Sequence, residues 1–376
     1  MAEAVQRYRL CEPCLGRQGG RASDFQPVGY DECFICGGLM ARVEELAESV
    51  ARKAKDHQFS TFGVGLSMPP GVQEREDEVR SALKLKGRET IKTQLSKSIG
   101  AKVAEDLGKE LEKLSPDLTA VVDLVSSKVD IYSKPLFFYG RYAKPQGLAQ
   151  RRERCPECSG RGCEVCKMTG FDRSPSVEEK VGRVLAGATG AESTKFTWIG
   201  TEDKESAVLA PGRPFVVELK NPKKRNAPKK FVTRGRGRRV VVSRGRLLPS
   251  RPTRLPSFRF LARITARTPN KVQPADLKQL AKVFHGAEVV FERPQGRPVS
   301  KRVYRVSAKA HGTTLVIDAE LDGGLPVKRF VSGELVSPSV SEVLKTDARC
   351  RKFDIRGVKE TGEFGFGEIS RLQKKD

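Results

Sequence analysis

Eight of the nine cysteines stand in four Cys-x-x-Cys pairs, and this spacing constrains the fold more than any other feature of the chain. The first two pairs enclose 18 residues and consist of Cys11, Cys14, Cys33 and Cys36. Each such turn directs two sulfur atoms toward one ion, so two turns complete a tetrahedral site for zinc. We therefore predict a structural zinc site in an N-terminal region, residues 1–56, that ends in a helix over Ala41–Lys55.

The other two pairs lie close together, in residues 146–175. They consist of Cys155, Cys158, Cys163 and Cys166, with Gly160 and Gly162 available for tight turns. This pattern predicts a second zinc knuckle, although spacing alone leaves open whether all four sulfur atoms bind one ion. The ninth cysteine, Cys350, stands alone and is not expected to bind zinc.

Length and charge indicate the class of protein. A chain of 376 residues is long enough for two or three domains. Its net charge of +24 indicates a polyanionic partner, either nucleic acid or a membrane surface. No apolar run approaches the roughly 20 residues of a membrane-spanning helix, and the N-terminus lacks the apolar segment of a signal peptide. A cytoplasmic protein that binds nucleic acid is therefore expected.

The cationic residues are concentrated in one run. Leu219–Arg254 contains 14 lysines and arginines and no acidic residue. Such a run is expected to repel itself and to stay mobile until phosphates neutralise it. A second stretch, Pro135–Lys144, mixes aromatic and cationic residues, which suits either RNA binding or an ordinary core strand.

Hydrophobic periodicity predicts an α+β protein. Residues 57–145 alternate strands and helices, and residues 176–376 contain several antiparallel strands with few helices. Within the second block, a short apolar strand, Phe196–Ile199, precedes the acidic residues Glu202 and Asp203. A Gly-Arg-Pro turn at Arg213 then opens the next strand. This arrangement would place a carboxylate at a sheet edge, where it is either a catalytic acid or a simple turn residue.

Taken in order, these motifs resemble those of the archaeal tRNA pseudouridine synthases of the Pus-ten type. The resemblance covers nearly the whole chain and is carried by five stretches: Cys11–Arg17, Pro135–Tyr142, Cys155–Gly170, Gly200–Phe215 and Val327–Glu334. It implies an RNA-binding THUMP domain at 57–145 and a pseudouridine-synthase domain with a mixed or antiparallel sheet at 176–376. The implied partner is tRNA, bound by a monomer that uses structural zinc and no organic cofactor.

The resemblance also implies a catalytic site. The family's nucleophile, the aspartate of a Gly-Arg-Glu-Asp motif, corresponds to Asp203. The family isomerises uridines 54 and 55 in the TΨC arm of tRNA, and the target base must leave its stack to react. Phe260 falls where the family places an aromatic residue, usually Tyr, beneath that base. The remaining pocket positions correspond to Arg213, Val327, Lys328 and Phe353.

One departure bears on activity. The family's arginine two residues before the aspartate is Thr201 here. That arginine would pair with the aspartate and keep it ionised. Lys204, Arg213 or Lys328 are candidates to replace it. If none does, the chain is a slow enzyme or a non-catalytic tRNA-binding or folding factor. Another THUMP-type RNA-modifying enzyme is the remaining alternative, and a methyltransferase is disfavoured because no cofactor-binding loop is present.

Overall fold

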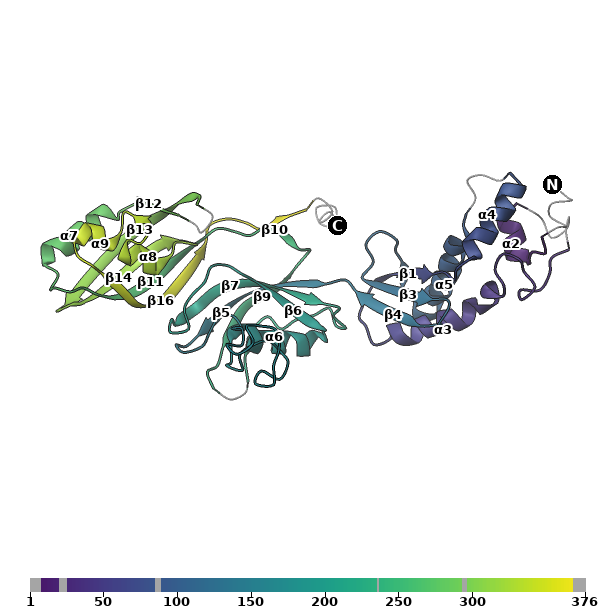
Figure 1. Ribbon diagram of the computed structural model, residues 1–376, viewed down its shortest axis with the longest axis horizontal. Coiled ribbons are helices and arrows are strands. Elements are labelled where there is room, and N and C mark those ends of the chain that lie inside the picture. The colour runs from purple at the N-terminus through teal and green to yellow at the C-terminus, as the bar shows by residue number, and fades with distance from the viewer. Residues whose placement is uncertain (1–7, 20–25, 85–88, 235–236, 293–295, 368–376) are drawn as a thin grey trace. The chain divides into compact units, whose positions relative to one another are not determined.

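The computed structural model describes residues 8–19, 26–84, 89–234, 237–292 and 296–367. The chain forms two compact units (Figure 1). Unit 1 consists of residues 1–135 together with Asn221–Arg225, and unit 2 consists of Leu136–Lys220 and Asn226–Asp376. The chain therefore passes from the second unit back to the first for five residues, between two strands of the second unit.

Unit 1 is built on a four-stranded sheet of order β2-β1-β3-β4. The strands are β1 (Thr61–Ser67), β2 (Glu110–Leu111), β3 (Leu118–Asp123) and β4 (Val129–Ser133). Strand β1 pairs in parallel with β2 and β3, and β3 pairs antiparallel with β4. The burial of every second residue in β3 gives the sheet one apolar face.

The helices of unit 1 follow the predicted pattern closely. They are α2 (Glu12–Arg17), the 3-10 turn η1 (Leu39–Arg42), α3 (Val43–Ala54), α4 (Val72–Ala82) and α5 (Ile91–Leu107). The side chain of Thr90 caps α5 by accepting a hydrogen bond from the Thr93 amide. Helix α5 ends where Gly108 takes the left-handed conformation, and Glu110–Leu111 then form β2.

The first cysteine cluster shares a core with the rest of unit 1. Cys14 and Cys36 are buried together with Phe62 and Leu95 of the sheet and its helices. A buried ion pair joins the Arg17 and Glu76 side chains at 2.7 Å, and Glu76 also accepts the Ile91 amide at the start of α5. The N-terminal cysteine region is therefore packed onto the α/β sheet as part of one unit.

Unit 2 is built on a large mixed sheet with the order β15-β12-β13-β14-β11-β16-β7-β5-β9-β8, and β6 also pairs with β7. Its strands are β5 (Leu136–Lys144), β6 (Ser193–Trp198), β7 (Val208–Lys220), β8 (Phe231–Val232), β9 (Val241–Leu248), β11 (Phe258–Arg267), β12 (Ala287–Glu292), β13 (Pro298–His311), β14 (Thr314–Asp322), β15 (Val336–Ser337) and β16 (Arg349–Glu360). A separate two-stranded pair joins β10 (Pro252–Arg254) to β17 (Gly365–Phe366).

The two halves of this sheet meet at one short parallel contact between β16 and β7, where Ile355 lies opposite Val208. The helices are α6 (Val177–Thr189), α7 (Pro274–Val283), α8 (Val327–Ser332) and α9 (Val340–Leu344). Alternate residues of β11, from Phe258 to Ala266, are buried. The helices α8 and α9 contact each other, and α8 contacts β16, so this part of the core lies between sheet and helices (Figure 1).

Two expectations from the sequence differ from the structure. Leu136–Lys144 had been placed at the end of the preceding domain, but these residues form β5, which pairs with β7 and β9 inside the sheet of unit 2. The prediction that Leu219–Arg254 stays mobile is wrong for most of its described residues. Strand β9 pairs along β5, and Val242 in it is fully buried. Backbone pairing and apolar alternation outweigh the charge repulsion here, because the arginines of β9 point to solvent.

Candidate active site

The loop between β6 and β7 turns its two neighbouring acids in opposite directions. The side chain of Glu202 is fully buried, whereas that of Asp203 is 41% exposed. Gly200 and Gly212 have positive φ angles of 76° and 91°, and a Cβ on Gly200 would lie 2.0 Å from the Arg213 side chain. Glycine at position 200 is therefore what allows Arg213 to lie against the loop.

Arg213 binds Glu202 and the backbone of the loop. Its Nη1 donates to Glu202 Oε2 at 3.1 Å, and its Nε donates to the Ile199 carbonyl oxygen at 3.0 Å. The hydroxyl of Tyr142 in β5 donates to the other Glu202 oxygen at 2.5 Å. Burial raises the pKa of Glu202, and the Arg213 guanidinium opposes that shift. The pair Glu202–Arg213 therefore stabilises the loop from inside, and among the described residues Arg213 forms its ion pair with Glu202 and not with Asp203.

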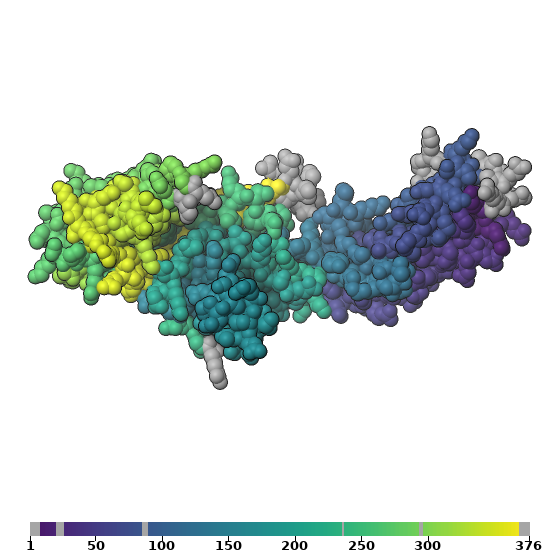
Figure 2. Space-filling view, in the orientation of Figure 1, coloured from purple at the N-terminus to yellow at the C-terminus, as the bar shows by residue number. Residues whose placement is uncertain are grey.

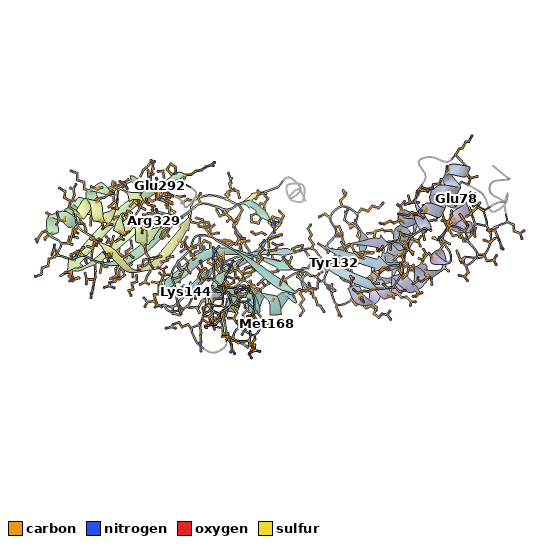
Figure 3. The ribbon with its side chains drawn as sticks, viewed as in Figure 1. Glu78, Tyr132, Lys144, Met168, Glu292 and Arg329 are labelled. Atoms are coloured by element: carbon orange, nitrogen blue, oxygen red, sulfur yellow. The ribbon has the colours of Figure 1, made fainter. Side chains whose placement is uncertain are left out.

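Lys144, at the end of β5, holds the same loop by its backbone. It is only 3% exposed, and its Nζ donates to the carbonyl oxygens of Leu148 at 2.7 Å and Ser206 at 2.6 Å. A longer bond of 3.2 Å reaches the carbonyl oxygen of Asp203 itself. Burial lowers the pKa of Lys144, while nearby carboxylates, Glu202 first among them, oppose that shift. Sequence reasoning included Lys144 only in a stretch suited to RNA binding or to a core strand and gave it no role in the site. Figure 3 labels its position in unit 2.

Asp203 pairs with Lys328, the second residue of α8. Lys328 Nζ lies 2.9 Å from Asp203 Oδ2, and this hydrogen bond raises the pKa of Lys328. Of the three cations proposed to replace the missing arginine, Lys328 is the one whose ion pair with Asp203 is found among the described residues. The carboxylate is thus held next to a positive charge while it stays accessible to solvent.

A pocket of about 520 Å³ opens beside this ion pair. All six residues predicted for the site line it: Asp203, Arg213, Phe260, Val327, Lys328 and Phe353. Phe260 and Phe353 come from the adjacent strands β11 and β16, and Val327 begins α8. The structure therefore gathers on one pocket residues that are spread over 150 positions of sequence (353 − 203). The arrangement offers a carboxylate, a cation and apolar rings to one small planar group.

The eight paired cysteines form two compact clusters. In each cluster one ligand atom from every cysteine lies within 4.8 Å of all the others. The sulfur–sulfur distance is 3.7 Å for Cys11–Cys36 and 3.9 Å for Cys158–Cys166. Zinc–sulfur bonds of about 2.3 Å in a tetrahedron require about 3.8 Å between sulfur atoms. Both clusters could therefore hold a metal ion of this kind, and all four cysteines of the 155–166 cluster converge on one point. Figure 2 shows this second cluster's segment, in dark teal, at the surface of unit 2.

This α+β fold places an aspartate–lysine pair beside aromatic rings on a strongly basic chain. Such a combination is more typical of an RNA-modifying enzyme than of a structural protein. Comparison with known proteins makes this specific. The family model "Pus10 THUMP domain, archaeal" matches residues 46–123, and "Pus10, C-terminal" matches residues 137–239. The chain belongs to the Pus10 family of tRNA pseudouridine synthases, which are isomerases.

Curated relatives match over nearly the full length. The tRNA pseudouridine synthase Pus10 of Nitrosopumilus maritimus is 31% identical over 95% of this chain and 96% of its own. The Pus10 of Methanopyrus kandleri is 32% identical over 94% of this chain and 97% of its own. A solved structure, a Cbf5-Nop10-Gar1 complex, matches 46% of this chain and 42% of that chain at 12% identity, with a TM-score of 0.29. We draw nothing from a structural likeness at that score.

No helix among the described residues has both the length and the apolar character that crossing a membrane requires.

Proposed function

We propose that the chain isomerises uridine to pseudouridine in the TΨC arm of tRNA, at position 54, position 55 or both, with Asp203 as the nucleophile. The observation that carries this proposal is the position of Asp203, half exposed, 2.9 Å from Lys328 and on the same pocket as Phe260. Family membership supports tRNA as the substrate class.

The chemistry needs a carboxylate that the extruded base can reach. The bond from ribose to N1 of the uracil breaks, the base rotates, and a bond from ribose to C5 forms, so that the product has the atoms of the substrate. Asp203 would attack the nucleotide as the bond from ribose to N1 breaks, or would accept the proton that leaves C5 once the new bond has formed. N1 takes up one proton in exchange, so that atoms and charge balance. Lys328 would hold the carboxylate in position through their ion pair, and the Phe260 ring would stack on the extruded uracil.

The rest of the chain would bind the RNA and stabilise the fold. Family membership assigns the α/β sheet of unit 1 to the THUMP domain. We place its end at Pro135, with a zinc region at 1–56, a second zinc knuckle at 146–175 and the catalytic domain on the large sheet. The two cysteine clusters would bind one structural zinc ion each. The protein would act as a cytoplasmic monomer.

The decisive experiment replaces one atom of the nucleophile. Asp203→Asn keeps the shape of the side chain and removes its charge. Transcribed tRNA incubated with this variant should contain no detectable pseudouridine at any enzyme concentration, while its tRNA affinity stays within about threefold of wild type because phosphates are held elsewhere. Surviving activity would assign the nucleophile to another carboxylate. A wild-type protein that binds tRNA without making pseudouridine would instead be a non-catalytic tRNA-binding factor.

A further inference from the structure

A second pocket adjoins the first on unit 2 and takes no part in the proposed chemistry. It has a volume of about 490 Å³ and shares four lining residues with the Asp203 pocket: Gly200, Arg213, Phe260 and Gly324. Volumes of roughly 300–1,000 Å³ are typical of sites for small ligands. The Arg213 guanidinium lies 6.0 Å from the centre of the Phe260 ring, and these two side chains stand between the pockets.

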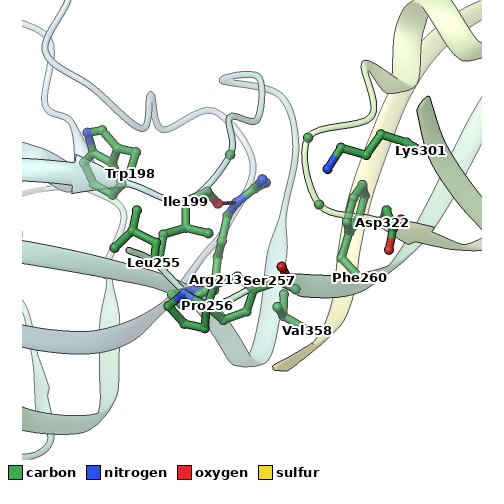
Figure 4. A pocket seen from close by; sticks show the side chains of 15 residues that line it. Trp198, Ile199, Arg213, Leu255, Pro256, Ser257, Phe260, Lys301, Asp322 and Val358 are labelled. Carbon is green, nitrogen blue, oxygen red and sulfur yellow. Dashed lines mark hydrogen bonds between the residues drawn. The ribbon is translucent and has the colours of Figure 1, made fainter. Parts of the chain in front are cut away.

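One wall of this second pocket is apolar and the other is charged (Figure 4). Trp198 and Ile199, at the end of β6, face the pocket together with Leu255 and Pro256, which precede β11. Trp198 is kept in place by stacking on Phe196, with ring centres 4.9 Å apart. An aromatic and aliphatic wall of this kind suits the flat face of a base.

The opposite wall carries Lys301 of β13 and Asp322 of β14 (Figure 4). The Asp322 carboxylate is fixed because it accepts the Tyr304 hydroxyl at 2.9 Å and the Arg302 amide at 3.0 Å. A carboxylate has about four lone-pair positions, so two fixed donors leave it able to accept N–H groups from a ligand. Lys301 adds a positive charge at the same wall, next to Gly324.

We propose that this second pocket binds a base of the substrate RNA that neighbours the target uridine and leaves its stack together with it. The proposal rests on the function proposed above, because it takes the Asp203 pocket as the site of the target base. The shared wall of Arg213 and Phe260 would then separate two consecutive nucleotides of one strand. Asp322 would accept a hydrogen bond from an N–H group on the edge of the bound base, and Lys301 would contact an acceptor atom or the phosphate.

The test couples a change in the protein to a change in the RNA. Ser257, an exposed residue on the pocket's lining, is replaced by Trp to fill the space. The RNA is a tRNA assembled by ligation with one abasic nucleotide immediately before or after the target. Affinities of the full-length protein are measured by filter binding. For wild type, one of the two abasic tRNAs should bind about five- to a hundredfold more weakly, the range that loss of one stacked base produces.

The Ser257→Trp protein should bind the intact tRNA more weakly than wild type does, by a similar factor. Removing the same base from the tRNA should then lower the affinity of this variant by less than about a further twofold. Lys301→Ala, which leaves the pocket open, should also reduce the abasic penalty. Lys309→Ala removes the same charge from the same strand outside the pocket and should keep the full penalty. Ser257 and Lys309 are exposed and Lys301 is half-buried, so the comparison does not depend on filling the pocket alone.

The proposal would be overturned if the losses of affinity from Ser257→Trp and from the abasic nucleotide were additive. It would also be overturned if wild type bound both abasic tRNAs as tightly as the intact tRNA. Unchanged binding of intact tRNA by Ser257→Trp would also overturn it and would leave the pocket to a different ligand. Because every readout is an affinity, the result is separate from turnover. Absence of pseudouridine with the wild-type protein would refute the proposed reaction, whereas loss of the coupling would refute only the second base pocket.

Discussion

Lys328 Nζ lies 2.9 Å from Asp203 Oδ2, and this ion pair stands where the family's missing arginine would be expected to act. The two side chains are 56% and 41% exposed, so the pair contributes little to stability, roughly 0.2–1 kcal/mol at such sites. Its effect should instead be on the charge and position of the carboxylate. The cation comes from α8, far along the chain, and not from the loop itself.

The first prediction concerns this replacement cation. Lys328→Ala should lower the rate of pseudouridine formation by about 10- to 100-fold, with the free energy of unfolding changed by less than about 1 kcal/mol. Lys328→Arg should recover part of the rate because it keeps the charge. Lys282→Ala, at an exposed position of α7 outside the pocket, is the matched control and should keep the wild-type rate. A rate that Lys328→Ala leaves unchanged would show that Asp203 needs no cation.

The same ion pair predicts the alkaline behaviour. The Asp203 hydrogen bond raises the pKa of Lys328, so the folded protein holds this proton more tightly than the unfolded chain does. The contribution of the pair to activity should be fully present below the ordinary lysine pKa of about 10.4 and should be lost as pH rises through the raised value. In Lys328→Arg that alkaline loss should move to still higher pH. Coincident pH–rate profiles for the two proteins would contradict this.

A further prediction concerns Lys144, which positions the loop without touching the pocket. Lys144→Met keeps the length of the side chain and leaves several buried carbonyl oxygens without their donor. We expect the rate constant for catalysis to fall by at least about tenfold and the protein to lose about 1–3 kcal/mol of stability. The affinity for tRNA should stay within about threefold. Lys195→Met, on an exposed position of β6, should change none of these quantities.

Substitutions of Phe260 test whether its ring stacks on the target uracil. Phe260 is only 6% exposed, so Phe260→Ala would create a cavity costing about 3–5 kcal/mol and would confuse stability with function. Phe260→Leu keeps most of the volume and removes the ring. It should slow turnover by about tenfold or more, whereas Phe260→Tyr should be tolerated. Phe284→Leu, a buried ring of α7 away from the pocket, should lose stability with little change in rate. Equal rates for the Leu and Tyr variants would show that Phe260 only fills the hydrophobic core and does not stack on the substrate.

Metal content is predicted from the cysteine geometry. Elemental analysis of protein purified without chelator should give two zinc ions per chain. Cys33→Ser and Cys158→Ser should each remove one, and Cys350→Ser should remove none. Cys33→Ser should also unfold unit 1 while the large sheet of unit 2 stays folded, because the first cluster lies in the core of unit 1 and thiolate ligation contributes to folding directly. Fewer than one zinc per wild-type chain would count against both sites.

The last prediction is about salt. Two cations of the Lys223–Arg225 triplet have acidic neighbours within unit 1: Lys223 lies 3.9 Å from Asp56, and Arg225 lies 3.6 Å from Asp117. No ion pair in the described part of the chain involves Lys229, Lys230 or Arg239, which are all exposed. Changing these three to Ala should flatten the log–log salt dependence of tRNA affinity by about two to three units, more than changing the Lys223–Arg225 triplet does. Equal slopes for both triple variants would show that ion pairing does not matter here.

The sequence predicted local elements: the helix expected over Ala41–Lys55 is α3 (Val43–Ala54), and the strand expected over Phe196–Ile199 overlaps the end of β6. The alternation of apolar residues in β11 indicates a strand, and the Thr90 cap indicates the start of helix α5. It also predicted the members of the pocket, but only through resemblance to a family. Periodicity contains no information that places Phe353 of β16 on the same pocket as Phe260 of β11, because strand order is set by packing over long distances.

The opposite orientations of Glu202 and Asp203 agree with the general rule that neighbouring side chains in an extended segment point to opposite faces. Other features could not be predicted, because they depend on partners that are distant in sequence. The choice of Lys328 over Arg213 as the partner of Asp203 could not be made, because it depends on how α8 packs beside the loop. The ordered state of β9 was missed for the same reason: its partner, β5, had been assigned to another domain.

The excursion of residues 221–225 into unit 1 has a consequence for biosynthesis. The Asn221 side chain accepts the Ser133 amide at 2.6 Å, and the Lys223 carbonyl oxygen accepts the Gln58 amide at 2.7 Å. Although most of unit 1 leaves the ribosome first, these hydrogen bonds cannot form until residue 225 has also emerged. By then, β5, β6 and β7 of the large sheet have already been synthesised. The RNA-binding half of this enzyme is therefore completed only while its catalytic half is being made, and a gene fragment that stops at residue 135 would encode an unfinished domain.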